Sequence, residues 1–416
     1  MQSPKHPNGA TREGALAPHA AARGGALGTN AKYGAKCPMA ARVERFALQS
    51  VARAILPTSR TAKCLRIRSG NPNSKADGVG VWKSRDHGTA HYSGLQTCGS
   101  VWTCPVCAAK ISERRRAEVL AAMTAHKAAG GCVNLLTLTA PHQRSDDLAE
   151  LLDKQAVAVG SFWKDMTVRQ ILADMGTLGQ IRAWEVTNGR KSAHNNGWHP
   201  HFHVLLFSGS GVDLARFDAA QMKDWAVRLY LRWAAKCKAA GLGEPSFKHG
   251  LKLDDGSKAA AYAAKWGLED EITRGHTKKG KEGGETPFDL LRAFLADKTD
   301  KQAAALFQVY AVAFKGKRQL HWSAGLKARY AIEESTDDQL AQRVEERAEL
   351  LGLLTVDQWR DVLKVDGRAT VLEVAARSGW EAVTRYLDII KGAHQGVQLD
   401  RDVLAEAREI LLQWGG

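Results

Sequence analysis

Ten residues in the middle of the chain, Trp198–Phe207, constrain the fold and its chemistry most. They read WHPHFHVLLF, so three histidines within five positions run directly into an apolar stretch. This stretch predicts a buried strand, whose successive side chains point to opposite faces. His201 and His203 then share one face, which suits a divalent metal ion, although two solvated strand histidines would give the same pattern. His199 has the same parity, but the proline after it breaks the ladder, so we expect it to lie outside the ligand set.

A second predicted strand, residues 181–187, precedes the histidine strand and is joined to it by a polar loop. Two such runs predict an antiparallel hairpin. A symmetric hairpin places Glu185 opposite or diagonal to His203, within reach across the strands. Glu185 is then either a solvated carboxylate or a third ligand, and the paired imidazoles on its face favour the ligand.

A group of cysteines lies well before this hairpin. It contains a Cys-x-x-Cys pair, whose spacing lets two thiolates reach one tetrahedral ion across a tight turn. The ligands expected for a structural Zn²⁺ ion are Cys64, Cys98, Cys104 and Cys107. His87 and His91 are substitutes for the fourth ligand, Cys64. A redox-active pair is the competing interpretation, but no βαβ pattern surrounds it.

The bulk composition bounds the class of protein. The 416 residues carry a net charge of +15, which attracts polyanions, and nucleic acid is the commonest of these. The seven cysteines are odd in number and unevenly spread, which argues against a secreted disulfide framework. No run of 18 apolar residues occurs and no secretory signal begins the chain, so we expect a cytoplasmic protein without a membrane partner.

Basic residues gather in three places. Residues 1–58 form a cationic arm, expected to be largely disordered, in which only Val43–Leu56 has helical periodicity. This arm either follows a phosphate backbone or only keeps the chain soluble. Two shorter clusters are either solvated surface or DNA contacts, and their residues are Arg114, Arg115, Arg116, Lys317 and Arg318.

A tyrosine with two lysine neighbours lies on a predicted helix beginning near Ser257. Lys258, Tyr262, Lys265 and Glu269 fall on one side of that helix. The lysines, about one turn before and after, favour the phenolate form of Tyr262. An ordinary amphipathic helix would carry the same tyrosine.

The chain from Ser335 onward predicts helices throughout. A capping box at Thr355 and Gln358 marks one helix start. Two apolar runs between 372 and 387 meet at Gly379. This spacing is compatible with a helix-turn-helix, but it is more typical of an ordinary αα-hairpin.

Three sequence blocks, in this order, resemble the motifs of rolling-circle replication initiators, which belong to the HUH endonucleases (named for His-hydrophobic-His). The blocks are Leu135–Thr139, Gly197–His203 and Tyr262–Lys265. Other blocks resemble those of plasmid replication proteins that carry an N-terminal Cys-rich zinc knuckle, and these are Cys98–Cys107, Thr286–Phe288 and Leu320–Leu326. The resemblance spans roughly residues 60–332.

The resemblance implies an α+β fold, with the histidine strand central in an antiparallel sheet and the tyrosine helix laid across it. Together with the composition of the two ends, it divides the chain into four parts: a basic arm (1–58), a Cys-rich zinc-knuckle region (59–110), a nicking domain (111–332) and an all-helical C-terminal region (333–416).

The resemblance also implies the chemistry. Tyr262 would cleave a phosphodiester at a plasmid origin, in DNA that is single-stranded or extruded as a hairpin. The cleavage would form a 5′-phosphotyrosine and a free 3′-hydroxyl. Mn²⁺ or Mg²⁺ held by His201, His203 and Glu185 would polarise the phosphate, and Lys265 would offset its charge. A host helicase is a further partner that such an initiator would recruit.

One position departs from the pattern. Some relatives carry a glutamate one turn before the tyrosine, thought to activate water in the terminating cleavage, and here that position is Lys258. Glu269 or an acid of the Asp254–Asp255 pair would take that role. A transposase or relaxase would share the chemistry on other DNA, and a non-catalytic zinc-knuckle regulator would keep the cysteines but form no tyrosine adduct.

Overall fold

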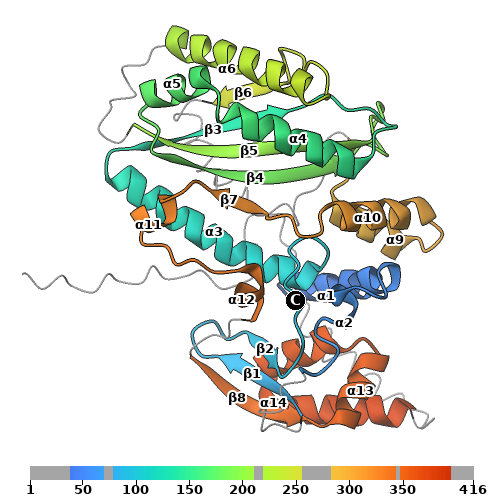
Figure 1. Cartoon of the computed structure of the whole chain (residues 1–416). Helices are drawn as coiled ribbons and strands as arrows, with labels where there is room; N and C mark the ends of the chain where they lie inside the picture. Colours follow the sequence, from blue (N-terminus) through green and yellow to red (C-terminus); the bar gives the residue numbers. More distant parts are fainter. Residues whose placement is uncertain (1–37, 70–77, 210–218, 255–282, 343–346, 395–416) are drawn as a thin grey trace, which may run out of the picture.

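Two lobes make up the part of the chain that the computed structural model describes, residues 38–69, 78–209, 219–254, 283–342 and 347–394 (Figure 1). The upper lobe is built on a five-stranded antiparallel sheet with the strand order β6-β3-β5-β4-β7. Its strands are β3 (Cys132–Thr139), β4 (Gly179–Asn188), β5 (Trp198–Ser208), β6 (Leu251–Asp254) and β7 (Leu320–Trp322). The histidine strand β5 is central, as expected, and the α+β class is confirmed.

The two faces of this sheet are covered by different helices, because β5 alternates between two cores. Phe202, Val204 and Leu206 pack under α4 (Leu148–Phe162), α5 (Met166–Asp174) and α6 (Ala219–Ala239). Leu205 and Phe207 face the long helix α3 (Pro105–Ala128) together with β7. All five side chains are at most 1% exposed. Each such burial contributes roughly 1.5–3 kcal/mol, so a one-residue slip of β5 is strongly disfavoured.

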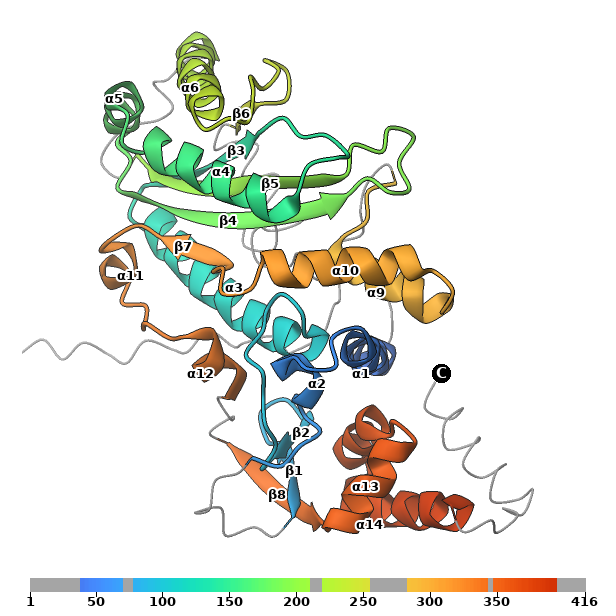
Figure 2. The same cartoon turned by 45° about the vertical axis from the view of Figure 1, so that its right-hand side comes forward.

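A layer of helices lies between the lobes (Figure 2). It contains α1 (Pro38–Ile55), α2 (Arg60–Lys63), α9 (Pro287–Ala296) and α10 (Lys301–Ala313). The apolar stripe expected at the end of the arm is real, because Phe46, Leu48, Val51 and Ile55 are all buried. Residues 38–55 are therefore a packed helix, and the boundary of the basic arm at residue 58 is too late.

The lower lobe joins two regions that the sequence had kept apart. The strands β1 (Val79–Ser84) and β2 (Ala90–Ser93) form one sheet with β8 (Ala348–Leu354), in the order β2-β1-β8. Two helices, α13 (Val356–Lys364) and α14 (Arg368–His394), pack on it. The C-terminal region is mainly helical, but the expectation that it is wholly helical is wrong, because β8 is a strand paired with the Cys-rich region.

Short helices complete the described part of the chain, α11 (Leu326–Arg329) and α12 (Asp337–Gln342). The capping box at Thr355 is present, with hydrogen bonds in both directions between Thr355 and Gln358. Within α14, Gly379 has φ 76° and ψ −169°, which breaks the helix at the expected hinge. Among the described residues, no helix is long and apolar enough to cross a membrane.

Candidate metal centres

The first candidate centre lies on the β4–β5 hairpin, on the sheet face that also carries α3. The register places Glu185 directly opposite His201 and hence diagonal to His203, as the symmetric hairpin predicts. Glu185 Oε2 is 3.0 Å from Nε2 of His203 and 3.7 Å from Nε2 of His201, and the two Nε2 atoms are 3.2 Å apart. Three side chains from two strands thus direct their ligand atoms at one point.

The donor set and its spacing fit a hard or borderline divalent ion. An octahedral ion with bonds of about 2.1 Å separates neighbouring ligand atoms by roughly 3.0 Å, close to the spacing found here. The three side chains are 11–16% exposed, so the group is open to solvent on one side. Mixed imidazole and carboxylate ligands with room for further ligands are typical of catalytic sites.

A threonine that sequence reasoning did not single out orients one imidazole. Thr137, on β3, lies opposite His203 in the register, and its Oγ1 is 3.2 Å from His203 Nδ1. This contact leaves Nε2 of His203 directed at Glu185 and His201. Period-2 parity within the first motif, residues 135–139, is the signal that could have found it.

His199 takes part in a different contact. Its ring stacks on His142, with centroids 4.7 Å apart and an interplanar angle of 14°. Burial, together with the neighbouring His201 and His142, lowers the pKa of His199 to about 3, so the ring is neutral at pH 7. The ligand cluster contains Glu185, His201 and His203 without it.

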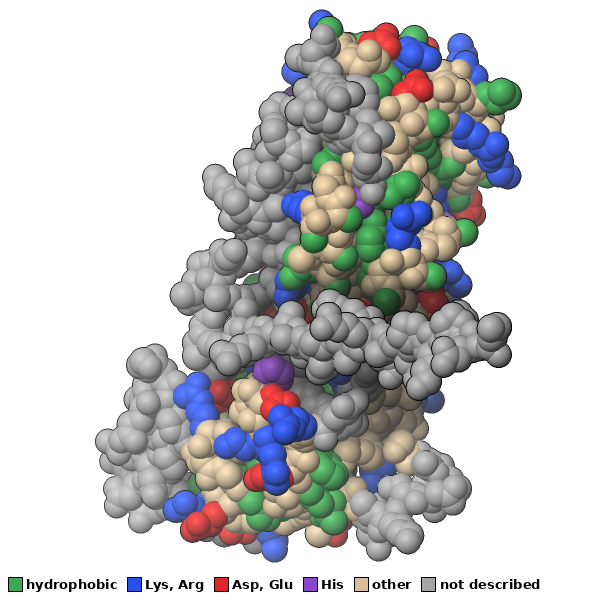
Figure 3. Space-filling view, turned by 90° about the vertical axis from the view of Figure 1, so that its left-hand side faces the viewer, with side chains coloured by type: hydrophobic (Ala, Val, Ile, Leu, Met, Phe, Trp, Pro, Cys, Tyr) green, Lys and Arg blue, Asp and Glu red, His purple; other side chains and the backbone are tan. Residues whose placement is uncertain are grey.

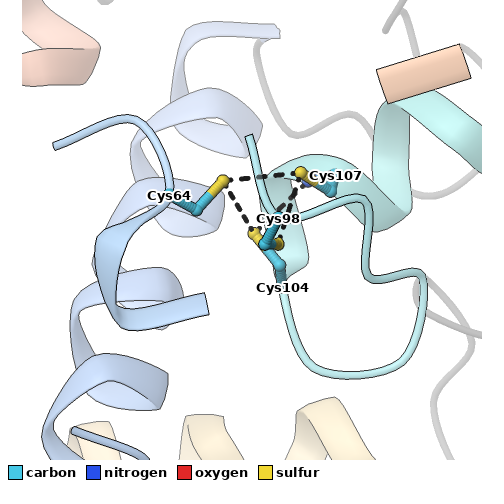
Figure 4. A group of neighbouring side chains, drawn as sticks. All are labelled: Cys64, Cys98, Cys104 and Cys107. Carbon is cyan, nitrogen blue, oxygen red and sulfur yellow. Dashed lines mark hydrogen bonds between the residues drawn. The ribbon is translucent and has the colours of Figure 1, made fainter. Parts of the chain in front are cut away.

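The second candidate centre is the group of four cysteines expected from the sequence (Figure 4). Cys64 follows α2, Cys98 lies in the loop after β2, and Cys104 and Cys107 begin α3. Cys104 is the N-cap of that helix, and its sulfur accepts a hydrogen bond from the Cys107 N–H. All four are at most 5% exposed. Cys64 completes the group, and His87 and His91 are not part of it.

The sulfur spacing fits a tetrahedral ion. The Cys64–Cys107, Cys98–Cys107 and Cys64–Cys104 sulfurs are 3.5, 3.6 and 3.8 Å apart, and all four thiols are free. A tetrahedron with Zn–S bonds of about 2.3 Å has edges of roughly 3.8 Å. Burial alone would raise the pKa of the Cys104 thiol. Hydrogen bonds with Cys107, Cys64 and Cys98 outweigh this effect and bring the pKa well below its usual range.

Aromatic side chains connect the two centres. Trp102, in the loop between Cys98 and Cys104, packs on Phe314 with ring centroids 4.6 Å apart, and its Nε1–H donates to Lys317 O at 2.6 Å. Tyr310, one turn before Phe314, stacks on Trp198 at the start of β5, at 6.3 Å. The loop between Cys98 and Cys104 therefore packs against the end of α10, and α10 in turn packs against the first residue of β5.

The expected nucleophile, Tyr262, lies outside the described residues. So do the residues expected to assist it, Lys265, Glu269 and Asp255, and the neighbouring Lys258. Asp254 is described, at the end of β6, and it pairs with Lys252 at 3.0 Å.

Most of the basic residues expected to contact DNA have partners within the protein. Arg115 pairs with Glu118 at 3.0 Å and Asp337 at 2.9 Å, and Arg116 pairs with Glu113 at 2.7 Å. Of the second cluster, Lys317 pairs with Asp153 at 3.1 Å, whereas Arg318 is exposed. On the face drawn in Figure 3, Lys and Arg side chains lie over both lobes among acidic and apolar ones. The charges of Arg115 and Arg116 are therefore already offset by acidic side chains of the protein.

Comparison with known proteins agrees with the prediction made from the sequence motifs. Residues 93–221 match the model of a family described as replication protein. A "Protein rep" of Streptomyces lividans is 27% identical over 360 residues, which cover 72% of this chain and 74% of that protein. A "Neomycin resistance protein" of Streptomyces cyanogenus is 31% identical over 155 residues, covering 32% of this chain and 35% of that protein. No solved structure matches the chain. The resemblance of this chain to the replication initiator proteins of rolling-circle plasmids is confirmed by these matches.

Proposed function

We propose that this protein is a plasmid replication initiator that nicks one strand of the double-strand origin and later rejoins the displaced strand. The observation that carries the proposal is the Glu185–His201–His203 group, which lies within the span that matches the replication protein family. The net charge of +15 favours DNA as the partner. A host helicase would be recruited afterwards, and all these steps belong in the cytoplasm, where plasmid DNA lies.

Three residues of the sheet would hold a divalent ion, and a fourth would orient them. Glu185, His201 and His203 supply the ligands, with Thr137 holding His203 through its Nδ1. Mn²⁺ or Mg²⁺ bound there would polarise the scissile phosphate. The partial exposure of the three ligands, 11–16% of each side chain, would let phosphate oxygens approach the ion.

Tyr262 is the proposed nucleophile. Its phenolate oxygen bonds to phosphorus while the bond from phosphorus to the 3′ oxygen breaks. The leaving oxygen takes up a proton to become the free 3′-hydroxyl, which balances the proton lost by the phenol. The 5′-phosphotyrosine conserves the bond energy for rejoining. Lys265 would offset the phosphate charge, and Glu269 or the Asp254–Asp255 pair would activate water in the terminating cleavage.

The four cysteines would bind Zn²⁺ with a structural role. Their burial leaves no position for a substrate, which is typical of closed structural sites. The aromatic contacts from Trp102 through Tyr310 to Trp198 would carry that support to the histidine strand.

The decisive experiment looks for the covalent adduct. The protein is incubated with Mn²⁺ and single-stranded origin DNA labelled at its 3′ end, then run on a denaturing gel. We expect a protein–DNA adduct with the wild-type chain and none with Tyr262→Phe, which should still bind the origin. Tyr330→Phe is the matched control, because Tyr330 bonds His126 and lies outside the metal groups.

The outcome also separates the other classes. An adduct of undiminished yield in Tyr262→Phe would refute the assignment of the nucleophile. A wild-type chain that binds DNA but forms no adduct would indicate the non-catalytic zinc-knuckle regulator. An adduct formed on mobile-element ends or a transfer origin, but not on a plasmid replication origin, would indicate a transposase or a relaxase.

A further inference from the structure

A chain of buried polar contacts runs from the C-terminal helices to one of the four cysteines. We propose that Gln49 and Arg368 together hold Cys104 in position as a metal ligand, and that they thereby couple metal binding to the docking of α14. This inference rests on the proposal that the cysteine group binds a metal ion.

The contacts are short, and none of the three residues reaches solvent. Gln49, on α1, donates from Nε2 to Cys104 Sγ at 3.2 Å. Arg368, at the start of α14, donates from Nη1 to Gln49 Oε1 at 2.5 Å. Gln49, Cys104 and Arg368 are each 0% exposed. Three segments far apart in the sequence are thus joined by one line of contacts that ends at the Cys104 sulfur.

The chemistry of the arginine fixes which way the amide of Gln49 points. A guanidinium group has donors and no acceptor, so the amide oxygen must face Arg368. The amide nitrogen then faces Cys104 and presents an N–H to the sulfur. This relay, from Arg368 through Gln49 to Cys104, therefore fixes both ends of the amide and holds the Cys104 sulfur in one position.

The relay also brings positive charge close to the cysteine group. Four thiolates around a divalent ion carry a net charge of −2, which is costly to bury. Arg368 and Arg66 both pair with one carboxylate, Asp366, at 2.9 and 3.2 Å. These three side chains therefore leave a net positive charge beside the group. Arg368 Nη1 also lies 3.4 Å from the carbonyl oxygen of Leu65, the neighbour of Cys64.

Further contacts attach this relay to the lower lobe. The hydroxyl of Tyr92, on β2, donates to Arg368 O at 2.8 Å, and Trp359 Nε1 donates to Arg66 O at 2.8 Å. The Arg368 guanidinium also lies over the ring of Phe46, 5.0 Å from its centroid. Displacing α14 would therefore remove the donor that orients Gln49, and loss of the thiolate charge would weaken the position of Arg368.

The test measures metal affinity directly on the full-length protein. The metal-free chain is titrated with Co²⁺ under reducing, anaerobic conditions, with thiolate-to-cobalt charge-transfer absorption as the readout. Zn²⁺ affinity follows by competition with a chromophoric chelator. We expect Gln49→Met, which keeps the volume but removes the donor, to weaken binding about 10- to 100-fold, the range typical of groups that support metal ligands.

Two further variants separate positioning from general loosening of the fold. Ser50→Ala is the matched control. Ser50 lies next to Gln49 on α1 and accepts hydrogen bonds from Arg368 and Arg66, but it does not touch a cysteine. We expect it to bind metal within about twofold of wild type. Gln49→Glu keeps the contact with Arg368 while removing the donor to sulfur, so it should fold well and still bind metal weakly.

Each outcome decides one claim. Wild-type affinity in both Gln49 variants would overturn the relay, and so would an equal loss in Ser50→Ala. A wild-type chain that binds neither Co²⁺ nor Zn²⁺ through thiolates would refute the metal site itself, which is a different failure. Arg368→Met should shift the charge-transfer band and lower the affinity as Gln49→Met does, and an unchanged spectrum and affinity would overturn the role of Arg368.

Discussion

The two candidate metal groups of this protein differ in burial, in ligand type and in where their ligands come from. The four cysteines are at most 5% exposed and come from two segments of the chain, Cys64 after α2 and the stretch from Cys98 to Cys107 (Figure 4). The Glu185–His201–His203 group lies on a single hairpin, and 11–16% of each side chain is exposed. A metal ion would be enclosed by soft thiolates in the first group, whereas in the second it would be held by harder ligands and stay partly accessible.

This difference predicts that folding depends on metal binding at the first group and not at the second. Ligands from separate segments can be brought together only when the chain folds, so metal binding there adds directly to folding. Ligands two residues apart on a strand, facing a third across a hairpin, are positioned by the sheet before any ion arrives. We therefore expect the cysteine group to govern stability and the histidine group to govern activity.

The largest effect should follow removal of a cysteine ligand. Structural zinc contributes on the order of 10 kcal/mol, which is comparable to the whole stability of a domain. Cys104→Ser should therefore lose zinc and the cooperative unfolding of the protein, as measured by metal analysis and thermal melting. Cys132→Ser, which lies outside both groups, is the control and should keep both. A folded Cys104→Ser variant with a full zinc content would show that the group is not a structural site.

The next largest effect is on catalysis alone. His203→Ala removes one ligand of the open group, which consists of Glu185, His201 and His203. It should lower the nicking rate by at least about a hundredfold, as loss of a group that stabilises the transition state does. The zinc content and the melting temperature of the apo form should stay close to those of wild type. A fall in zinc content in this variant would contradict the separation of the two groups.

The histidine strand and its carboxylate partner could be predicted because the relevant physics is local. Side-chain parity placed His201 and His203 together, and one hairpin brought Glu185 across from them. The cysteine group followed from ligand spacing in the same way. The role of the tyrosine helix could not be compared, since it lies outside the described residues.

What the sequence could not provide depends on distant partners. The β8 segment reads AELLGLL, a composition that also suits a helix, and pairing with β1 decides in favour of a strand. Gly352 allows Trp380 to pack where a Cβ would collide. The ion pair of Arg115 with Asp337 was equally hidden, but Glu113 and Glu118, three residues from Arg116 and Arg115, were a local sign that these charges are offset.

A smaller effect should appear in stability when the open group is filled. Mn²⁺ at a hundred times its dissociation constant would stabilise the wild-type protein by about 2.7 kcal/mol, a rise of a few degrees in melting temperature. His203→Ala should show no such rise. An equal rise in that variant would mean that Mn²⁺ stabilises the protein from another site.

The smallest effect tests how the sheet orients a ligand. Thr137→Val keeps the shape of the side chain but removes the hydroxyl that lies 3.2 Å from His203 Nδ1. The imidazole is then free to change its tautomer, so we expect the affinity for Mn²⁺ to fall about tenfold, at the low end for such contacts. Calorimetric titration of Mn²⁺ into the two proteins measures this, with Thr139→Val as a control on the same strand face. Because Thr137 lies on β3 and not on the hairpin, a loss here means that the open group also depends on a third strand. An unchanged affinity would mean that the hairpin alone positions its ligands.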